Sequence, residues 1–199
     1  MKYLFASLLI LTIVIISGCT QASLQTTQEI EQITKAAAEN KDIQKCEEIT
    51  IVARDGGGWD RDNCYHNYAF VHQDVSACDK ISSGGNKAEC KIHIASIIGN
   101  ENICNALTEE DITNYDLANT LAHAKNICFA NVATEHKKIS VCDMYLPDPD
   151  NEIPIETAKE QCKDNIKTTC EYYLNSTSTD ETTQTFKQRC LENYVGPGS

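Results

Sequence analysis

The segment 64–78, CYHNYAFVHQDVSAC, holds the densest group of side chains that could do chemistry. It carries a cysteine at each end and two histidines, His66 and His72, between them. Thiolate and imidazole groups bind zinc and form nucleophilic dyads. Residues six positions apart lie on opposed faces of a helix, however, so these two histidines cannot share a metal ion from one helix. We predict structural or surface roles for them and for the remaining three: His93, His123 and His136.

Catalytic and cofactor signatures are missing from the sequence. It has no G-x-S-x-G motif, no H-E-x-x-H motif and no phosphate-binding P-loop. The sequence therefore predicts a non-enzymatic protein that uses no cofactor.

Eleven cysteines are the most informative residues of the chain. Cys19 follows an apolar leader, which leaves an even number: Cys46, Cys64, Cys78, Cys90, Cys104, Cys128, Cys142, Cys162, Cys170 and Cys190. Zinc and iron–sulfur sites usually use close pairs such as C-x2-C, and the shortest gap here is eight positions, from Cys162 to Cys170. An even set in an exported chain predicts structural disulfides, with thiol–disulfide exchange as the less favoured alternative.

The first 18 residues have the pattern of an export signal. Lys2 precedes an apolar run, 3–16, that would span only about 21 Å as a helix, too short to cross a bilayer. The run leads into ISGC at 16–19, which resembles the lipobox of prokaryotic lipoproteins. The resemblance implies cleavage before Cys19, lipid attachment to its thiol and residence on the extracytoplasmic face of the cell membrane. The alternative is an ordinary signal peptide followed by an unrelated cysteine.

The formal net charge of −12 limits the partners. An acidic surface repels phosphates, so we expect no nucleic-acid partner. We expect instead a protein partner or a cell-surface component, besides the membrane reached through the lipid.

The cysteine spacing reveals an internal repeat. Three intervals are all fourteen positions, namely Cys64–Cys78, Cys90–Cys104 and Cys128–Cys142, whereas the gaps that alternate with them are 18, 12, 24 and 20 positions. In each repeat a basic residue stands three positions before the second of its two cysteines, which are Cys64, Cys90, Cys128, Cys162 and Cys190. These basic residues are Arg61, Lys87, Lys125, Lys159 and Lys187. An alanine follows that cysteine by five residues in three units: Ala69, Ala95 and Ala133. Asp42 and Asp74 stand four residues before their cysteines, where a helix N-cap would lie.

Helical periodicity runs through the repeats. Cys64, Tyr68 and Val71 share one helical face, and the strict alternation typical of strands is absent. Cys162 and Cys170 are predicted to lie on one helix, because eight positions keep them on one stripe. We predict an all-α fold, an array of disulfide-stapled helical hairpins with about four to five degenerate repeats. The expected segments are a signal peptide at 1–18, a lipidated polar tether at 19–27, the repeat domain at 28–193 and a flexible tail at 194–199.

The geometry of antiparallel helices predicts which cysteines pair. Cys78 and Cys90 are equidistant from the turn at 82–86, whereas Cys64 and Cys78 lie at unequal distances from the turn at Asp74. A disulfide needs Cα atoms about 4.4–6.8 Å apart. We therefore predict sequential pairs: Cys46–Cys64, Cys78–Cys90, Cys104–Cys128, Cys142–Cys162 and Cys170–Cys190.

Two loops are candidate binding sites. In the glycine-rich segment 54–62, the single tryptophan and nearby carboxylates could form a binding loop: Asp55, Trp59, Asp60 and Asp62. The alternative is a helix capped by Asp60 with Trp59 folded onto the core. The second loop is the acidic turn, residues 147–152. Its carboxylates at alternate positions could bind calcium, although the glycine and the terminal glutamate of an EF-hand are missing. These carboxylates are Asp148, Asp150 and Glu152. The alternative there is a solvated turn.

Asn175 begins the sequence Asn-Ser-Thr, an N-glycosylation acceptor motif. In style the chain loosely resembles uncharacterised cysteine-rich helical-repeat lipoproteins of archaea, and that resemblance implies no activity. We predict a membrane-anchored structural or protein-interaction module, with a solute- or cation-binding lipoprotein as the alternative.

Overall fold

The computed structural model describes residues 25–50, 58–113, 118–150 and 152–195. Within these ranges every regular element is a helix and none is a strand. The predicted all-α fold is therefore confirmed for the described part of the chain. The predicted signal peptide, the lipidation site Cys19 and most of the tether lie outside it.

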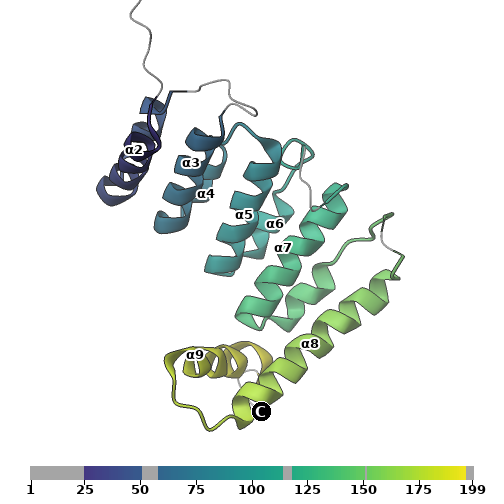
Figure 1. Ribbon diagram of the computed structural model, residues 1–199. Coiled ribbons are helices and arrows are strands. Elements are labelled where there is room, and N and C mark those ends of the chain that lie inside the picture. Colours follow the sequence, from purple (N-terminus) through teal and green to yellow (C-terminus); the bar gives the residue numbers. More distant parts are fainter. Residues whose placement is uncertain (1–24, 51–57, 114–117, 151, 196–199) are drawn as a thin grey trace, which may run out of the picture.

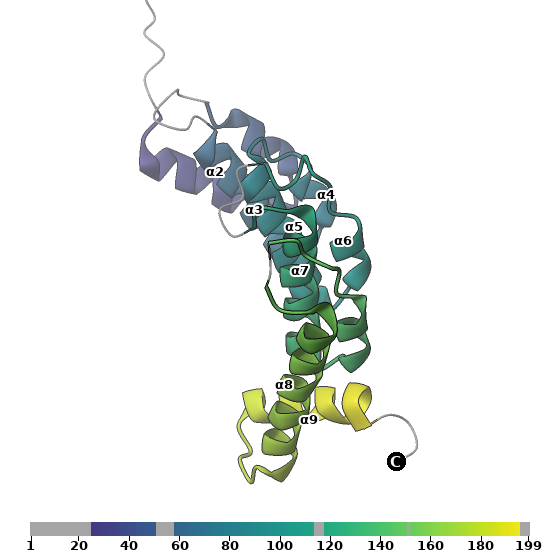
Figure 2. The same ribbon diagram turned by 90° about the vertical axis from the view of Figure 1, so that its right-hand side faces the viewer.

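The long helices lie side by side in a curved row (Figures 1 and 2). They are α2 (Thr27–Asn40), α3 (Trp59–His72), α5 (Gly84–Ile98), α7 (Leu121–His136) and α8 (Ile155–Asn175). Short helices form a second layer: η1 (Ile43–Glu48), α4 (Val75–Cys78), α6 (Glu101–Asn105) and η2 (Ile139–Met144). At the end of the row α9 (Glu181–Cys190) folds across α8 and continues into a π-helical turn, η3 (Leu191–Val195).

Helices α2, α3, α5 and α7 all end in the same way. The residue after each helix is left-handed and donates its N–H to the carbonyl oxygen of a fully buried alanine: Lys41 to Ala37, Gln73 to Ala69, Gly99 to Ala95 and Lys137 to Ala133. The following residue donates to the same carbonyl, so two hydrogen bonds close each helix. Ala37 is a further copy of the repeated alanine that the cysteine spacing does not identify, because no cysteine precedes it in α2.

Side-chain caps start the short helices that follow. The Asp42 carboxylate accepts a hydrogen bond from the Gln44 amide at 3.1 Å, and the Asp74 carboxylate accepts one from Ser76 at 3.0 Å. Both predicted N-caps are confirmed. Asn100 caps α6 in the same manner.

Five disulfides run through the core, and they join the cysteine pairs that the spacing predicts: Cys46–Cys64, Cys78–Cys90, Cys104–Cys128, Cys142–Cys162 and Cys170–Cys190. The first four each tie a short helix to the next long helix, and the fifth ties α8 to α9. Helix α8 carries both Cys162 and Cys170, as predicted. Each closed loop contributes roughly 3 kcal/mol, which stabilises a core built mostly of Ala, Cys and Ile.

The stripe of Cys64, Tyr68 and Val71 on α3 is buried only in part. Tyr65 and Ala69 are buried beside Cys64, whereas Tyr68 is half-buried and Val71 is exposed. The helix is rotated so that the small alanine, rather than the valine, lies at the close contact between helices. Helical periodicity alone allowed either rotation.

The ordered domain extends slightly beyond its predicted bounds. The Gln25 side chain hydrogen-bonds to the main chain of Glu48 and Thr50, and α2 begins at Thr27. At the other end, Tyr194 packs against the core within η3. Residues 25–27 of the predicted tether and residues 194 and 195 of the predicted tail therefore belong to the helical domain.

Candidate functional site

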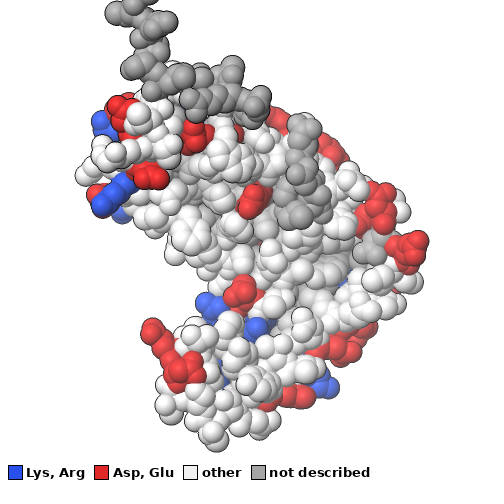
Figure 3. Space-filling model, in the orientation of Figure 1, with Lys and Arg blue, Asp and Glu red and all other residues white. Residues whose placement is uncertain are grey.

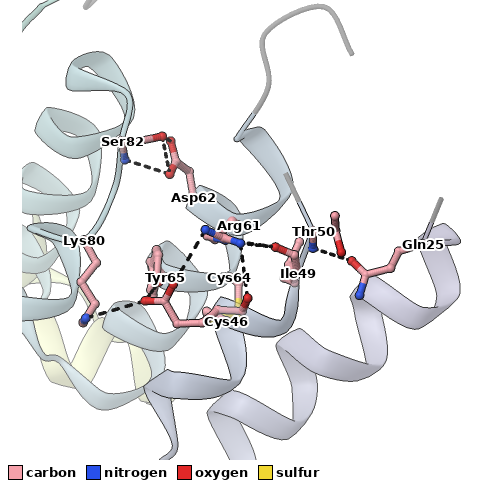
Figure 4. A network of polar contacts seen from close by, with 11 residues as sticks. Gln25, Cys46, Ile49, Thr50, Arg61, Asp62, Cys64, Tyr65, Lys80 and Ser82 are labelled. Carbon is pink, nitrogen blue, oxygen red and sulfur yellow. Dashed lines mark hydrogen bonds and ion pairs between the residues drawn. A yellow bond between two sulfur atoms is a disulfide. The ribbon is translucent and has the colours of Figure 1, made fainter. Parts of the chain in front are cut away.

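A pocket of about 300 Å³ lies where η1, α3 and the turn after α4 meet (Figure 4). The pocket is lined by Glu47, Gly58, Arg61, Asp62, Tyr65, Lys80 and Ser82. We call it the Glu47 pocket. It combines cations, carboxylates and hydroxyl groups, which makes it a candidate site for polar chemistry.

The Glu47 carboxylate is the centre of this pocket. The Tyr65 hydroxyl donates to it at 2.5 Å, and the cationic nitrogens of Arg61 and Lys80 lie 3.8 and 3.9 Å away. Burial, the hydrogen bond to Glu47 and the charge of that carboxylate raise the pKa of Tyr65. The phenol therefore stays protonated, and the pocket offers a hydrogen-bond donor rather than a nucleophile.

Arg61 shows what the repeated base does. Its guanidinium donates to the carbonyl oxygen of Ile49 at 2.6 and 3.0 Å, at the end of η1. Two other copies also donate to a carbonyl at the end of a helix: Lys125 to Asn105 at 2.8 Å and Lys187 to Ser176 at 2.6 Å. A cation at a helix C-terminus is favourable, so these bases cap the preceding helix.

Asp62 is not available to a ligand. Its side chain accepts hydrogen bonds from the amides of Ser82 and Ser83 at 2.9 and 3.0 Å and from the Ser82 hydroxyl at 3.1 Å. The residue is only 3% exposed. The prediction that Asp62 belongs to a binding loop is therefore wrong, because this carboxylate fixes the start of α5.

Trp59 and Asp60 lie on the surface at the start of α3. Trp59 is 61% exposed, so the alternative in which it folds onto the core is also wrong. The N-cap residue of α3 is Gly58, at a φ of 117°, and not Asp60. Asp55 lies outside the described residues. Of the predicted binding loop, the structure leaves Trp59 and Asp60 accessible.

Asp60 also contributes to a groove between α2 and α3, which we call the α2/α3 groove. Its volume is about 440 Å³, and it is lined by Thr27, Ile30, Glu31, Thr34, Lys35, Ala38, Glu39, Asp60, Asn63 and Asn67. Three carboxylates against one ammonium group make the groove acidic. Sequence reasoning missed this groove, because its two walls come from different helices.

The acidic turn does not form the predicted calcium site. The Asp148 side chain is only 3% exposed and accepts from the Thr120 hydroxyl and the Asp150 amide, both at 3.1 Å. Its other oxygen lies 2.8 Å from Nδ1 of His123. Asp148 thus ties the turn to the start of α7, while Asp150 and Glu152 stay exposed. The described residues hold no group of three or more His, Cys, Asp or Glu side chains placed to bind a metal ion.

His72 and His136 each link two neighbouring long helices. Nε2 of His72 lies 2.8 Å from the carbonyl oxygen of Ala38, and Nε2 of His136 lies 2.7 Å from that of Ser96. Both carbonyls belong to the residue after the repeated alanine, so the two contacts are equivalent in the repeat.

His66 and His93 approach each other across α3 and α5, at a distance of 3.2 Å between Nε2 and Nδ1. Sequence reasoning missed this pair. His66 follows Cys64 by two residues and His93 follows Cys90 by three, so aligning the two repeats would have placed them at one level.

Asn175 is the last residue of α8 and is exposed. Its side-chain amide donates to the carbonyl oxygen of Glu171 at 2.8 Å, on the final turn of the helix. The acceptor motif is thus displayed at a helix end, beside the exposed ring of Tyr172.

The five disulfides are typical of a protein from an oxidising, extracytoplasmic environment. Of the helices in the described ranges, none combines the length and the apolar composition that a bilayer span requires. No family model matches the chain, and no curated protein or solved structure matches it either.

Proposed function

We propose that the protein is a lipid-anchored, extracytoplasmic lipoprotein that acts as a non-enzymatic protein-interaction module. The observation that carries this proposal is the curved row of long helices held in place by five disulfides (Figures 1 and 2). Arrays of helical hairpins present extended faces to partners. A row that is stapled before binding loses little conformational entropy when a partner docks.

The exposed face of α3 is the best-supported contact surface. Trp59 and Phe70 are 61% and 54% exposed, and eleven residues, about three turns, separate them, so they share one face. Asn63, between them, lines the α2/α3 groove. Exposed aromatic side chains beside a groove are typical anchors of protein interfaces. Acidic side chains outnumber basic ones on the face in Figure 3, which favours a partner with basic side chains.

Thiol–disulfide exchange has less support. Nine of the ten bonded cysteines are 0% exposed, and only Cys162 is partly exposed. Exchange requires access of a thiolate to one sulfur. Counting free thiols on the native protein tests this alternative: a value of zero supports the interaction module, whereas a reactive pair supports the redox protein.

The interaction proposal is tested by placing a photo-crosslinking amino acid at Asn63 in cells that express the protein. We expect a discrete cross-linked envelope protein, and we expect Trp59→Ala to lower its yield by about tenfold or more. Tyr172→Ala is the matched control, because Tyr172 is also a strongly exposed aromatic residue and lies on α8, at the far end of the row. If the protein without a further substitution, the Trp59→Ala variant and the Tyr172→Ala variant give equal cross-linking yields, the exposed face of α3 is not the contact surface.

The anchor is tested separately with Cys19→Ser. We expect this variant to leave the membrane fraction and appear in the soluble extracytoplasmic fraction, because it has no thiol to carry lipid. A variant that stays with the membrane after a salt wash would overturn the lipid anchor without affecting the α3 face.

A further inference from the structure

His66 and His93 form a site that the interaction module does not use. Nε2 of His66, on α3, lies 3.2 Å from Nδ1 of His93, on α5, and the ring centroids are 5.3 Å apart. Both side chains reach the surface: His66 is partly exposed and His93 is exposed. The pair therefore joins two neighbouring repeats at a position that ions can reach.

The separation of the two nitrogens matches that of two ligands on one metal ion. Imidazole nitrogens bind zinc at about 2.0–2.1 Å, so two of them on a tetrahedral ion lie about 3.3–3.4 Å apart. Imidazole is a preferred ligand of zinc, copper and nickel. We propose that His66 and His93 bind a divalent transition-metal ion, with zinc as the expected ion, between α3 and α5.

The two helices hold the histidines at this spacing. Cys64, two residues before His66, is bonded to η1, and Cys90, three residues before His93, is bonded to α4. A site whose ligands are fixed in advance loses little entropy when the ion binds. Without an ion, one imidazole donates to the other. When the ion binds, the donating ring carries its proton on its other nitrogen instead, so both facing nitrogens present a lone pair to the metal.

A carboxylate lies near the pair and would offset the charge of a bound cation. The Glu89 carboxylate interacts electrostatically with His66. Glu89 lies four residues before His93, so both are on the same face of α5. No third side chain completes a cluster within the described residues, so water fills the other positions on the ion.

Isothermal titration calorimetry with zinc chloride tests the proposal. The sample is the oxidised protein, purified without a histidine tag and stripped with a chelator. We expect one ion per chain, and at least tenfold weaker binding for His66→Gln and for His93→Gln. His136→Gln is the matched control, because it changes another histidine between neighbouring long helices and keeps a donor for Ser96.

A spectroscopic readout makes the result independent of affinity. The electron paramagnetic resonance spectrum of the copper(II)-loaded protein should show two coordinated imidazole nitrogens in the wild type and one in His93→Gln. Circular dichroism of each variant checks that the helices are intact. The proposal is overturned if both variants bind zinc as tightly as the wild type, or if the wild type releases no heat at millimolar zinc.

Discussion

The carboxylate of Asp62 lies against Ser82, 2.9 Å from its amide nitrogen and 3.1 Å from its hydroxyl oxygen. This contact joins the first turn of α3 to the residue that precedes the N-cap of α5. A side chain in one repeat thus satisfies main-chain amides at the start of the next. The order of the row depends on such contacts as well as on the disulfides.

Replacing Asp62 should destabilise the fold, although its place in the glycine-rich segment 54–62 suggests a role in binding. In Asp62→Ala the amides of Ser82 and Ser83 lose a charged acceptor, and we expect the free energy of unfolding to fall by about 1.5–3 kcal/mol. Asp60→Ala is the control, because Asp60 is exposed and should change stability by less than about 0.5 kcal/mol. Urea unfolding followed by circular dichroism measures both, and equal effects would contradict the assignment.

The ion pair between Lys91 and the buried Asp111 should make stability depend on acid pH. Nζ of Lys91 lies 2.9 Å from the Asp111 carboxylate, which also accepts from the amide and hydroxyl of Thr108. Burial works against the charge of Asp111, but these hydrogen bonds outweigh it and lower the pKa of the carboxyl. The stabilisation is complete above the unfolded pKa of about 3.9 and is lost as the pH falls through the lower folded value.

We therefore expect Lys91→Met to lower the free energy of unfolding by about 1.5–3 kcal/mol at pH 7. The difference from the wild type should shrink as the pH falls through the lowered folded pKa of Asp111. Lys35→Met is the control: its ion pair with Glu39 is exposed on both sides and contributes less than about 1 kcal/mol. Denaturant titrations at several acid pH values measure the difference, and a gap that does not shrink as the carboxyl is protonated would contradict this role of the pair.

The disulfides should differ in how readily a reductant opens them. Cys162 is partly exposed, whereas the other bonded cysteines are fully buried. Under native conditions we expect a mild phosphine to open Cys142–Cys162 first, because attack needs access to a sulfur. Alkylation followed by peptide mapping identifies the opened bond. If a fully buried pair is labelled first, exposure does not control the order.

Gly84 should not tolerate a side chain. A methyl group there would lie 2.6 and 2.7 Å from the main-chain oxygens of Thr113 and Glu110, which cannot move as a side chain can. We expect Gly84→Ala to cost about 1–3 kcal/mol, even though alanine favours a helix by about 1 kcal/mol. Asn86→Ala, in the same helix, is the control and should be neutral or stabilising. Thermal unfolding measures both variants, and a stabilised Gly84→Ala would show that the loop 106–113 can shift.

Much of the fold could be predicted because the repeat leaves a local pattern in the sequence. The fourteen-position spacing, the helical periodicity and the distances of cysteines from their turns together yield the five disulfide pairs. Asp42 and Asp74 are predictable for the same reason, since a cap acts on amides two residues away. Each of these features depends on residues within one hairpin.

The candidate sites were predicted less well, because they depend on two hairpins at once. Nothing in the sequence indicates that the carboxylates of Asp62 and Asp148 have partners, yet each accepts a hydrogen bond from a residue at least 20 positions away. His66 and His93 look unrelated, yet they lie 3.2 Å apart. Aligning the repeats gives their level along the helices but not the rotation of α3 and α5 that turns the two rings toward each other.

The sequence by itself therefore determined the helical class, the repeat and the disulfide pairing, since local periodicity and short loop closures control them. Only the tertiary structure decided which way each helix is rotated in the row. That rotation buried Ala69 instead of Val71, exposed Trp59 and brought His66 to His93. The physical reason is that close packing of neighbouring helices selects one rotation from several that periodicity allows.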